Sequence, residues 1–311
     1  MKVAVILFNL GGPDSLAAVH PFLRNLFADP AIIGLPAGLR LPLARILAYR
    51  RSAKAREIYA KIGGSSPILG QTEAQARALE AKLGNCQHEW RGYVCMRYWH
   101  PLTQTVVRSV AQFAPDRIVL LPLYPQFSTT TTGSSFRAWK QAASFTAPTV
   151  SIKSYATDDG FVAASVDLVK QGLAEAGGTH ARVLFSAHGL PESTIKSGDP
   201  YQRQVEQTAR AIAARIGQLD SVVCYQSRVG PLKWIGPSTE NEIRRAARDN
   251  KAVVLYPLSF VSEHSETLYE LDIYARGLAQ ELGVGKYVRV PTVGTHPEFI
   301  AGLARLVRHA L

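Results

Sequence analysis

The side chains best suited to chemistry follow an apolar stretch late in the 311-residue chain. Glu263, His264, Glu266 and Glu270 lie just beyond the apolar run 252–258. If a helix begins at Glu263, the three glutamates occupy positions i, i+3 and i+7 and form one stripe on its face. Three carboxylates in such a stripe could hold a cation or pass protons from one to the next.

A second candidate is the sequence SAHGLP at residues 186–191, which follows the apolar run 182–185. His188 then lies at the carboxyl end of a strand, where ligands bind in open α/β sheets. Gly189 permits a sharp turn and Pro191 ends regular strand pairing. A histidine there can accept a proton or bind a metal, although a lone histidine is more often a structural residue.

The run 252–258 is expected to end at the same edge, which would bring the glutamates toward His188. Ser262 could cap their helix, with Glu263 in its first turn. Imidazole with carboxylate suits a weakly held divalent ion such as ferrous iron, whereas the absence of Cys ligands argues against a closed structural zinc site. The alternative is the solvated acidic start of an ordinary helix.

Strand-length apolar runs alternate with helix-period segments along the whole chain. This alternation predicts an α/β fold with two similar doubly wound, Rossmann-like domains, each containing a four-stranded parallel sheet. We place the domains at residues 1–150 and 151–295, with the C-terminal amphipathic helix 296–311 joining the first. The expected strands are 3–8, 93–96, 117–123, 150–154, 182–187, 221–225, 252–258 and 287–290.

A weak internal repeat supports this division. Residues 118–123 resemble 253–258, and residues 5–9 resemble 182–186. Such self-similarity makes a duplication plausible. The first half is longer between equivalent strands, and we assign its surplus to residues 30–70.

Within this surplus, residues 32–51 alternate apolar side chains with arginines, and Pro36 and Pro42 are expected to fragment their helix. The pattern predicts an apolar lip with basic neighbours, which could touch a membrane or cover an apolar ligand. An ordinary helix docked on the sheet is the alternative.

Composition narrows the function. The net charge of +11 favours anionic partners, but no nucleic-acid-binding motif is present, so nucleic acid is not expected as a partner. Cys86, Cys95 and Cys224 are too widely spaced for a disulfide framework or a Cys-x-x-Cys metal site. No apolar run is long enough to span a bilayer and no signal peptide is recognised, so we expect a cytoplasmic protein.

Two loops invite an anion-binding interpretation. The sequence NLGGP at 9–13 has the glycines but neither Gly-x-Gly-x-x-Gly nor the Lys-Ser/Thr of a Walker loop, so nucleotide binding is disfavoured. The hydroxyl-rich loop 124–135 could bind an anion at a helix N-terminus or simply cap that helix.

Taken in order, these motifs resemble the ferrochelatase family over nearly the whole chain. The matching segments are NLGGP at 9–13, IGGSSP at 62–67, MRYWHPLT at 96–103, residues 124–135, SAHGLP at 186–191, YQSRVGP at 225–231 with Trp234, and residues 262–272.

The resemblance implies insertion of ferrous iron into a porphyrin held in a cleft between two Rossmann-like domains. It implies that His188 and Glu266 are the metal-site pair, with Glu263 and Glu270 as further acidic catalytic residues. It also implies porphyrin contacts from Leu10, Arg51, Ser66, Arg97, Tyr98, Tyr124 and Trp234. Residues 32–50 match the family's apolar, membrane-facing edge, so peripheral membrane contact is expected.

The chain departs from some members of the family. Thr129 stands where iron–sulfur members have an internal cysteine, so we expect no iron–sulfur cluster and no permanently bound cofactor. Glu263 replaces a frequent aspartate, and Leu10 replaces Met or Tyr, which leaves the porphyrin orientation at that position open.

Several functions remain to be compared. The favoured one is conversion of protoporphyrin IX and Fe2+ to protohaem, the terminal step of haem biosynthesis. The alternatives are the same reaction on coproporphyrin III, whose four propionates would need more cationic partners, a non-catalytic tetrapyrrole or metal carrier, and a nucleotide-dependent transferase. The sequence leaves the oligomeric state open and favours a monomer.

Overall fold

The computed structural model describes residues 1–84, 88–178, 180–228 and 232–311, which form two compact units. Unit 1 comprises Met1–Tyr124, Ser128–Ser154 and Leu303–Leu311, and unit 2 comprises Pro125–Phe127 and Tyr155–Gly302. Helix α11 (Pro297–His309) is therefore shared, because the boundary falls between Gly302 and Leu303. Cys86 lies outside the described residues, as do residues 229–231 of the motif 225–231.

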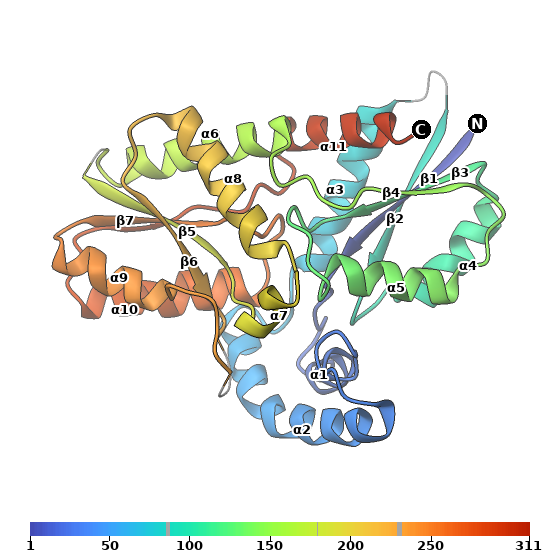
Figure 1. The fold of residues 1–311 in the computed structure, drawn as a ribbon, viewed down its shortest axis with the longest axis horizontal. Coiled ribbons are helices and arrows are strands. Elements are labelled where there is room, and N and C mark those ends of the chain that lie inside the picture. Colours follow the sequence, from blue (N-terminus) through green and yellow to red (C-terminus); the bar gives the residue numbers. More distant parts are fainter. Residues whose placement is uncertain (85–87, 179, 229–231) are drawn as a thin grey trace. The chain divides into compact units, whose positions relative to one another are not determined.

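Each unit contains a four-stranded parallel sheet (Figure 1). In unit 1 the order is β2-β1-β3-β4, with strands β1 (Lys2–Asn9), β2 (Glu89–Met96), β3 (Arg117–Pro122) and β4 (Thr149–Ser151). In unit 2 the order is β6-β5-β7-β8, with strands β5 (Ala181–His188), β6 (Ser221–Gln226), β7 (Ala252–Pro257) and β8 (Tyr287–Arg289). Every predicted run overlaps one of these strands, and the predicted α/β fold with two parallel four-stranded sheets is confirmed.

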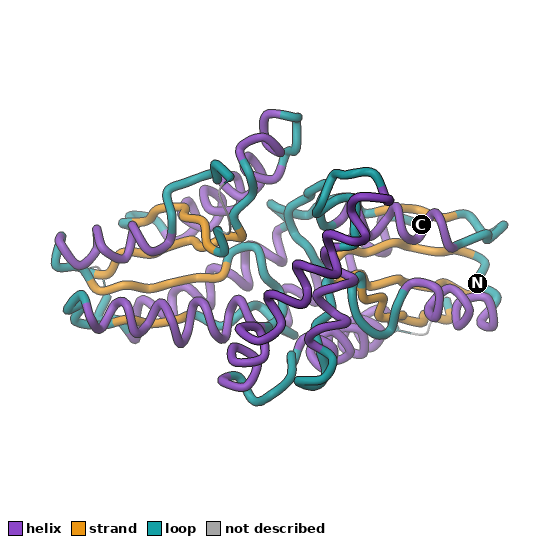
Figure 2. The backbone as a smooth tube through the Cα atoms, turned by 90° about the horizontal axis from the view of Figure 1, so that it is seen from below, coloured by secondary structure: helices purple, strands orange, loops and turns teal. Residues whose placement is uncertain are grey.

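Helices cover both faces of each sheet, which Figure 2 shows with the strands running across the picture and helices on either side of them. The helices of unit 1 are α1 (Val19–Phe27), α2 (Ala37–Lys61), α3 (Ile68–Leu83), α4 (Thr103–Phe113) and α5 (Thr132–Ala142). Those of unit 2 are α6 (Asp159–Glu175), α7 (Glu192–Lys196), α8 (Tyr201–Ile216), α9 (Thr239–Arg248), the π-helix η1 (Glu266–Tyr274) and α10 (Ala275–Glu281).

The alternation of side chains along each strand divides every core into two layers. In unit 1, Ile6 and Phe8 pack with Val110 of α4 and Trp139 of α5. In unit 2, Val183 and Phe185 pack with α6 and α8, while Leu184 and Leu255 pack with α9, η1 and α10. Because both faces of β5 and β7 are buried, these strands are apolar throughout and form a rigid base for the residues that follow them.

The surplus of unit 1 contains helices α1 and α2. Contrary to prediction, α2 is one continuous helix of 25 residues. Pro36 precedes its first turn, and Pro42 removes a single backbone hydrogen bond near its N-terminus, so the remaining turns continue unbroken. Across the described ranges, no helix is long and apolar enough to cross a membrane.

Backbone pairing defines which residues of the two units are equivalent. The Leu123 N–H donates to Phe8 O in unit 1 and the Leu258 N–H donates to Ser186 O in unit 2, both at 2.8 Å. The repeat of 118–123 in 253–258 therefore has the register expected from sequence. The proposed match of 5–9 with 182–186 is one residue out, because Phe8 is equivalent to Ser186.

The corrected register extends into the loops. It makes Leu10 equivalent to His188, and Tyr98 equivalent to Ser227. The hydroxyl of Thr103 contacts the Cys95 thiol at 3.7 Å, and the equivalent Thr239 contacts Cys224 at 3.3 Å. The two units thus share a framework, and the side chains that differ at equivalent positions are the ones that distinguish them.

Candidate active site

His188 and Glu266 meet at the carboxyl edge of the unit 2 sheet, the edge at which its strands end. His188 is the last residue of β5 and Glu266 is the first residue of η1. The Nδ1 atom of His188 lies 2.8 Å from Oε2 of Glu266. When the imidazole is neutral and donates through Nδ1, its Nε2 atom has a free lone pair that can accept a proton or bind a metal.

Ser227 connects this pair to Glu270. Its hydroxyl oxygen lies 3.2 Å from Glu266 Oε2 and 2.5 Å from Glu270 Oε2. Ser227 itself has a left-handed backbone conformation, with φ of 59°, which is uncommon for a residue other than glycine. One hydroxyl therefore touches both carboxylates and can pass a proton between them.

The electrostatics separate the roles of these groups. Burial by itself would lower the pKa of His188, but the Glu266 charge outweighs it and raises the pKa. Burial would likewise raise the pKa of Glu266, yet the neighbouring His188 holds it well below the ordinary value. Burial and the Glu266 charge together raise the pKa of Glu270 to about 7. His188 is thus a stronger base than usual, Glu266 remains ionised, and Glu270 can exchange a proton near neutral pH.

The predicted stripe of three glutamates is wrong. The helix begins at Glu266, three residues later than expected, with Ser265 rather than Ser262 at its N-cap position. It is a π-helix, in which backbone bonds join residues five apart. Glu266 and Glu270 lie on one face of the helix, as their shared contact with Ser227 shows. Glu263 precedes the helix and is not part of that face.

Glu263 instead pairs with β8. Its Oε1 atom accepts from Arg289 Nη1 at 2.6 Å and from the Thr292 N–H at 3.0 Å. The neighbouring His264 is buried, and its backbone N–H donates to the Thr267 hydroxyl at 3.0 Å. The structure therefore separates Glu263 from the contacts that join Glu266, Glu270 and His188.

Trp234 lies beside the turn that follows His188. It forms a bridge with Pro191, and a Cβ atom added to Gly189 would stand 3.4 Å from the indole ring. The same added atom would stand 2.8 Å from Gln226 O, so this position requires glycine. The structure thus places Trp234 close to His188, as an aromatic surface beside the pair.

The carboxyl edge of the unit 1 sheet gathers other predicted residues. The Tyr98 N–H donates to Leu10 O at 3.0 Å, and a Cβ atom on Gly12 would lie 2.5 Å from Ser66 Oγ. Tyr124 follows β3 at the same edge, half-buried against the core. Arg51 is exposed on α2.

Arg97 and Tyr98 are both bound to Asp29, a buried aspartate that sequence reasoning missed. Arg97 Nη2 lies 2.7 Å from Asp29 Oδ2, and the Tyr98 hydroxyl donates to the same oxygen at 2.8 Å. Ser134 of α5 also donates to this oxygen. Burial alone would raise the pKa of Asp29, but these hydrogen bonds and the Arg97 charge hold it below its ordinary value. The Arg97 charge is therefore already neutralised within unit 1.

Ser227 was also missed, although it belongs to a recognised motif. It could have been identified from its position, because it directly follows β6, which pairs with the strand that ends in His188. No comparable signal marked Asp29, since it lies in the loop after α1, many residues along the chain from the end of β1 and from the start of β2.

Few groups at the unit 2 edge could contact a metal. Among the residues that the structure describes, no group of three or more His, Cys, Asp or Glu side chains could hold a metal ion. His188 and Glu266 offer one nitrogen and one carboxylate, a mixture that suits borderline divalent cations. The arrangement can combine proton removal with brief metal contact.

A family model described as Ferrochelatase matches residues 2–311. A protein named Ferrochelatase from Caulobacter vibrioides (strain NA1000 / CB15N) is 55% identical, with 100% of this chain and 90% of the relative covered. Another of that name, from Wolbachia sp. subsp. Drosophila simulans (strain wRi), is 51% identical, with 98% of each covered.

Two solved structures share the fold at low sequence identity. SirB from Bacillus subtilis with Fe3+ has a TM-score of 0.58 at 13% identity, with 100% of this chain and 96% of that chain covered. CbiX, described as the terminal enzyme for biosynthesis of siroheme in denitrifying bacteria, has a TM-score of 0.55 at 18% identity, with 100% of both chains covered.

Proposed function

Because the chain belongs to the ferrochelatase family, we propose that it inserts Fe2+ into protoporphyrin IX to give protohaem and two protons. The observation that carries this proposal is the His188–Glu266 contact of 2.8 Å with Glu270 one hydroxyl away. Metalation replaces two pyrrole N–H bonds with iron–nitrogen bonds, so the site must remove two protons. The chain is accordingly a porphyrin metal chelatase acting in haem biosynthesis.

His188 is the group that accepts a pyrrole proton in this proposal. Its hydrogen bond to Glu266 fixes the ring and leaves Nε2 as the basic atom. The carboxylate of Glu266 then stabilises the imidazolium that forms. A positively charged His188 would repel iron. The accepted proton must therefore leave His188 before iron enters or as it enters.

Ser227 and Glu270 provide the route by which the proton leaves. Ionised Glu270 accepts a proton, and the Ser227 hydroxyl can reorient to serve either carboxylate. With a pKa of about 7, Glu270 can also release that proton to water near neutral pH. Glu266 is the group we propose to contact iron together with His188.

We propose that seven residues contact the porphyrin. From unit 1 these are Leu10, Ser66, Arg97, Tyr98 and Tyr124, with Arg51 of α2, and from unit 2 the contact is Trp234. Apolar and aromatic walls can direct binding energy into bending the macrocycle, which exposes its nitrogens. Arg51 is the first proposed partner of the propionates, and Arg97 is a second one whose charge would be shared between a propionate and Asp29.

Protoporphyrin IX is favoured over coproporphyrin III by the state of Arg97. Four propionates would require several available cations, whereas Arg97 is already paired with Asp29. The exposed apolar side chains of residues 32–50, among them Leu39 and Tyr49, also suit the more apolar porphyrin. Turnover of both porphyrins with Fe2+ under anaerobic conditions tests the choice, and faster turnover of coproporphyrin III would reverse it.

Residues 32–50 are also the proposed site of peripheral membrane contact. Leu39 is 64% exposed and Tyr49 is 79% exposed, and arginines stand among them. Burial of these side chains among lipid headgroups would be favourable, and the arginines would favour anionic lipids. Flotation with anionic and neutral vesicles tests this, and no binding to either would refute it.

We further propose that the protein is a cytoplasmic monomer without an iron–sulfur cluster or other permanent cofactor. The argument for the missing cluster is Thr129 at the position of the internal cysteine ligand. Iron and acid-labile sulfide analysis of anaerobically purified protein tests this, and stoichiometric sulfide would refute it.

A further inference from the structure

The acidic side chains around η1 divide into two groups that face different partners. Glu266 and Glu270 contact Ser227, as described above. Glu263 and Asp272 instead contact Arg289, the last residue of β8. Asp272 is two residues beyond Glu270, a spacing that puts side chains on different faces of a helix.

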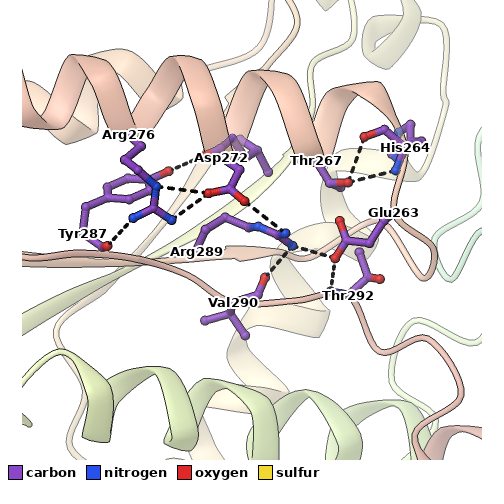
Figure 3. A network of polar contacts seen from close by, with 10 residues as sticks. Glu263, His264, Thr267, Asp272, Arg276, Tyr287, Arg289, Val290 and Thr292 are labelled. Atoms are coloured by element: carbon purple, nitrogen blue, oxygen red, sulfur yellow. Dashed lines mark hydrogen bonds and ion pairs between the residues drawn. The ribbon is translucent and has the colours of Figure 1, made fainter. Parts of the chain in front are cut away.

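Arg289 bridges the two ends of the segment that carries Glu266 and Glu270 (Figure 3). Its Nη1 atom lies 2.6 Å from Glu263 Oε1 and its Nη2 atom lies 3.4 Å from Asp272 Oδ2. The Arg289 side chain is only 10% exposed, so its charge requires these carboxylates. A guanidinium can serve both because its donors form a rigid planar fork.

The distal contact is itself held in place by a second arginine (Figure 3). Asp272 Oδ1 accepts from Arg276 Nη2 at 2.6 Å, and Arg276 Nη1 donates to Tyr287 O at 3.0 Å. The Tyr287 hydroxyl donates to Leu271 O at 2.5 Å. Hydrogen bonds and ion pairs thus connect β8 with the C-terminal half of η1 and with Arg276 of α10.

Unit 1 provides an internal comparison for this arrangement. Ile152 N–H donates to Leu120 O at 3.0 Å, and Val290 N–H donates to Leu255 O at 2.9 Å, so Ser151 is equivalent to Arg289. Ser151 is exposed, and the helix that follows β3 is the α-helix α5. Unit 1 thus has a serine at this position and an α-helix after β3, whereas unit 2 has Arg289 and the π-helix η1 after β7.

We propose that Arg289 is a positioning residue for iron insertion, which holds η1 in its π-helical form so that Glu266 and Glu270 share Ser227. The inference rests on the proposed function, because its consequence is felt in metal insertion. A π-helix is rare and its bonding is easily exchanged for α-helical bonding, so tertiary contacts must retain it. Residues four apart stay near one face in either helix, but the exchange would change both the rotation and the rise between Glu266 and Glu270, so that one hydroxyl would no longer contact both carboxylates at the observed distances.

The test compares Arg289→Ala with Arg182→Ala. Arg182 is a matched control because its side chain is also 10% exposed and also bridges two aspartates, Asp220 and Asp249. It lies near the start of β5, at the opposite edge of the sheet from His188. Both substitutions remove two ion pairs, so their effects on thermal unfolding should be similar.

Only Arg289→Ala should alter the reaction with metal. We expect kcat/KM for Fe2+ to fall by about 10- to 100-fold, with a raised KM, as is typical when a ligand's supporting contact is lost. The porphyrin dissociation constant, measured by fluorescence quenching, should not change. Equal KM values for Fe2+ in Arg289→Ala, Arg182→Ala and wild type would overturn the inference.

Arg289→Lys gives a second measurement if the alanine variant does not fold. Lysine keeps one charge near Glu263 but cannot bridge to Asp272, so an intermediate KM for Fe2+ is expected. A lysine variant identical to wild type would refute the bridging role. Wild-type protein that metalates no porphyrin would overturn the proposed function itself, which is a distinct result from unchanged kinetics in the variants.

Discussion

Leu10 and His188 occupy equivalent positions in the two units, as do Tyr98 and Ser227. In unit 1 the edge holds apolar and aromatic groups, together with an arginine whose charge is neutralised by Asp29. In unit 2 the same positions hold an imidazole and a hydroxyl that contact two carboxylates. One framework therefore supports a surface suited to binding and a site suited to proton and metal transfer, because the strand ends determine position and the loop residues determine chemistry.

The largest expected effect follows from replacing His188 by its unit 1 counterpart. His188→Leu removes the proposed base and the proposed metal-binding nitrogen, so the metalation rate should fall by ~10²- to 10⁴-fold. Steady-state metalation of protoporphyrin measures it, with circular dichroism to check the fold. Retained activity would show that the histidine is not what distinguishes the two edges.

Next in size is the loss of Asp29, the charged centre of the unit 1 edge. Asp29→Asn should lower the free energy of unfolding at pH 7 by about 3 kcal/mol, because it leaves Arg97 without its buried partner. The pKa of Asp29 is lowered in the folded state, so its contribution is present above its ordinary value near 3.8 and is lost as the pH falls through the folded value.

Urea unfolding of wild type and Asp29→Asn at several pH values measures this dependence. The difference between the two proteins should be constant above about pH 4 and shrink in more acidic solution. A difference that persists unchanged at low pH would mean that the aspartate's charge is not the cause.

A moderate effect is expected from Ser227, the counterpart of Tyr98. Ser227→Ala removes the hydroxyl between Glu266 and Glu270, and kcat should fall by roughly 10-fold because proton transfer becomes slower. Ser227→Gly serves as the control, since glycine relieves the left-handed backbone but also lacks the hydroxyl. If the glycine variant kept full activity, the hydroxyl would have no part in the relay.

The smallest effect is expected from Ser151→Arg, which installs the residue of β8 at the equivalent place in unit 1. Ser151 is exposed and precedes no π-helix, so stability should change by less than about 0.5 kcal/mol and turnover should not change. Thermal unfolding and steady-state kinetics check both. A marked loss of activity would show that residue 151 of unit 1 affects the reaction, contrary to the division of roles between the two units.

Much of the fold was predictable because strand positions depend on local apolar runs. The eight strands and the grouping of His188 with Glu266 follow from runs of buried residues and from the rule that parallel strands end at one edge. The role of Pro42 was misjudged, because a single missing hydrogen bond near a helix start does not end a 25-residue helix.

The sequence by itself determined the two parallel sheets and the placement of His188 and Glu266 at a carboxyl edge. Only the tertiary structure decided that Glu263 pairs with Arg289, that Ser227 joins Glu266 to Glu270, and that Arg97 is neutralised by Asp29. The reason is physical: apolar periodicity is a local property of the chain. The partner of a buried charge is instead chosen among residues far apart in sequence, once packing has removed water from both.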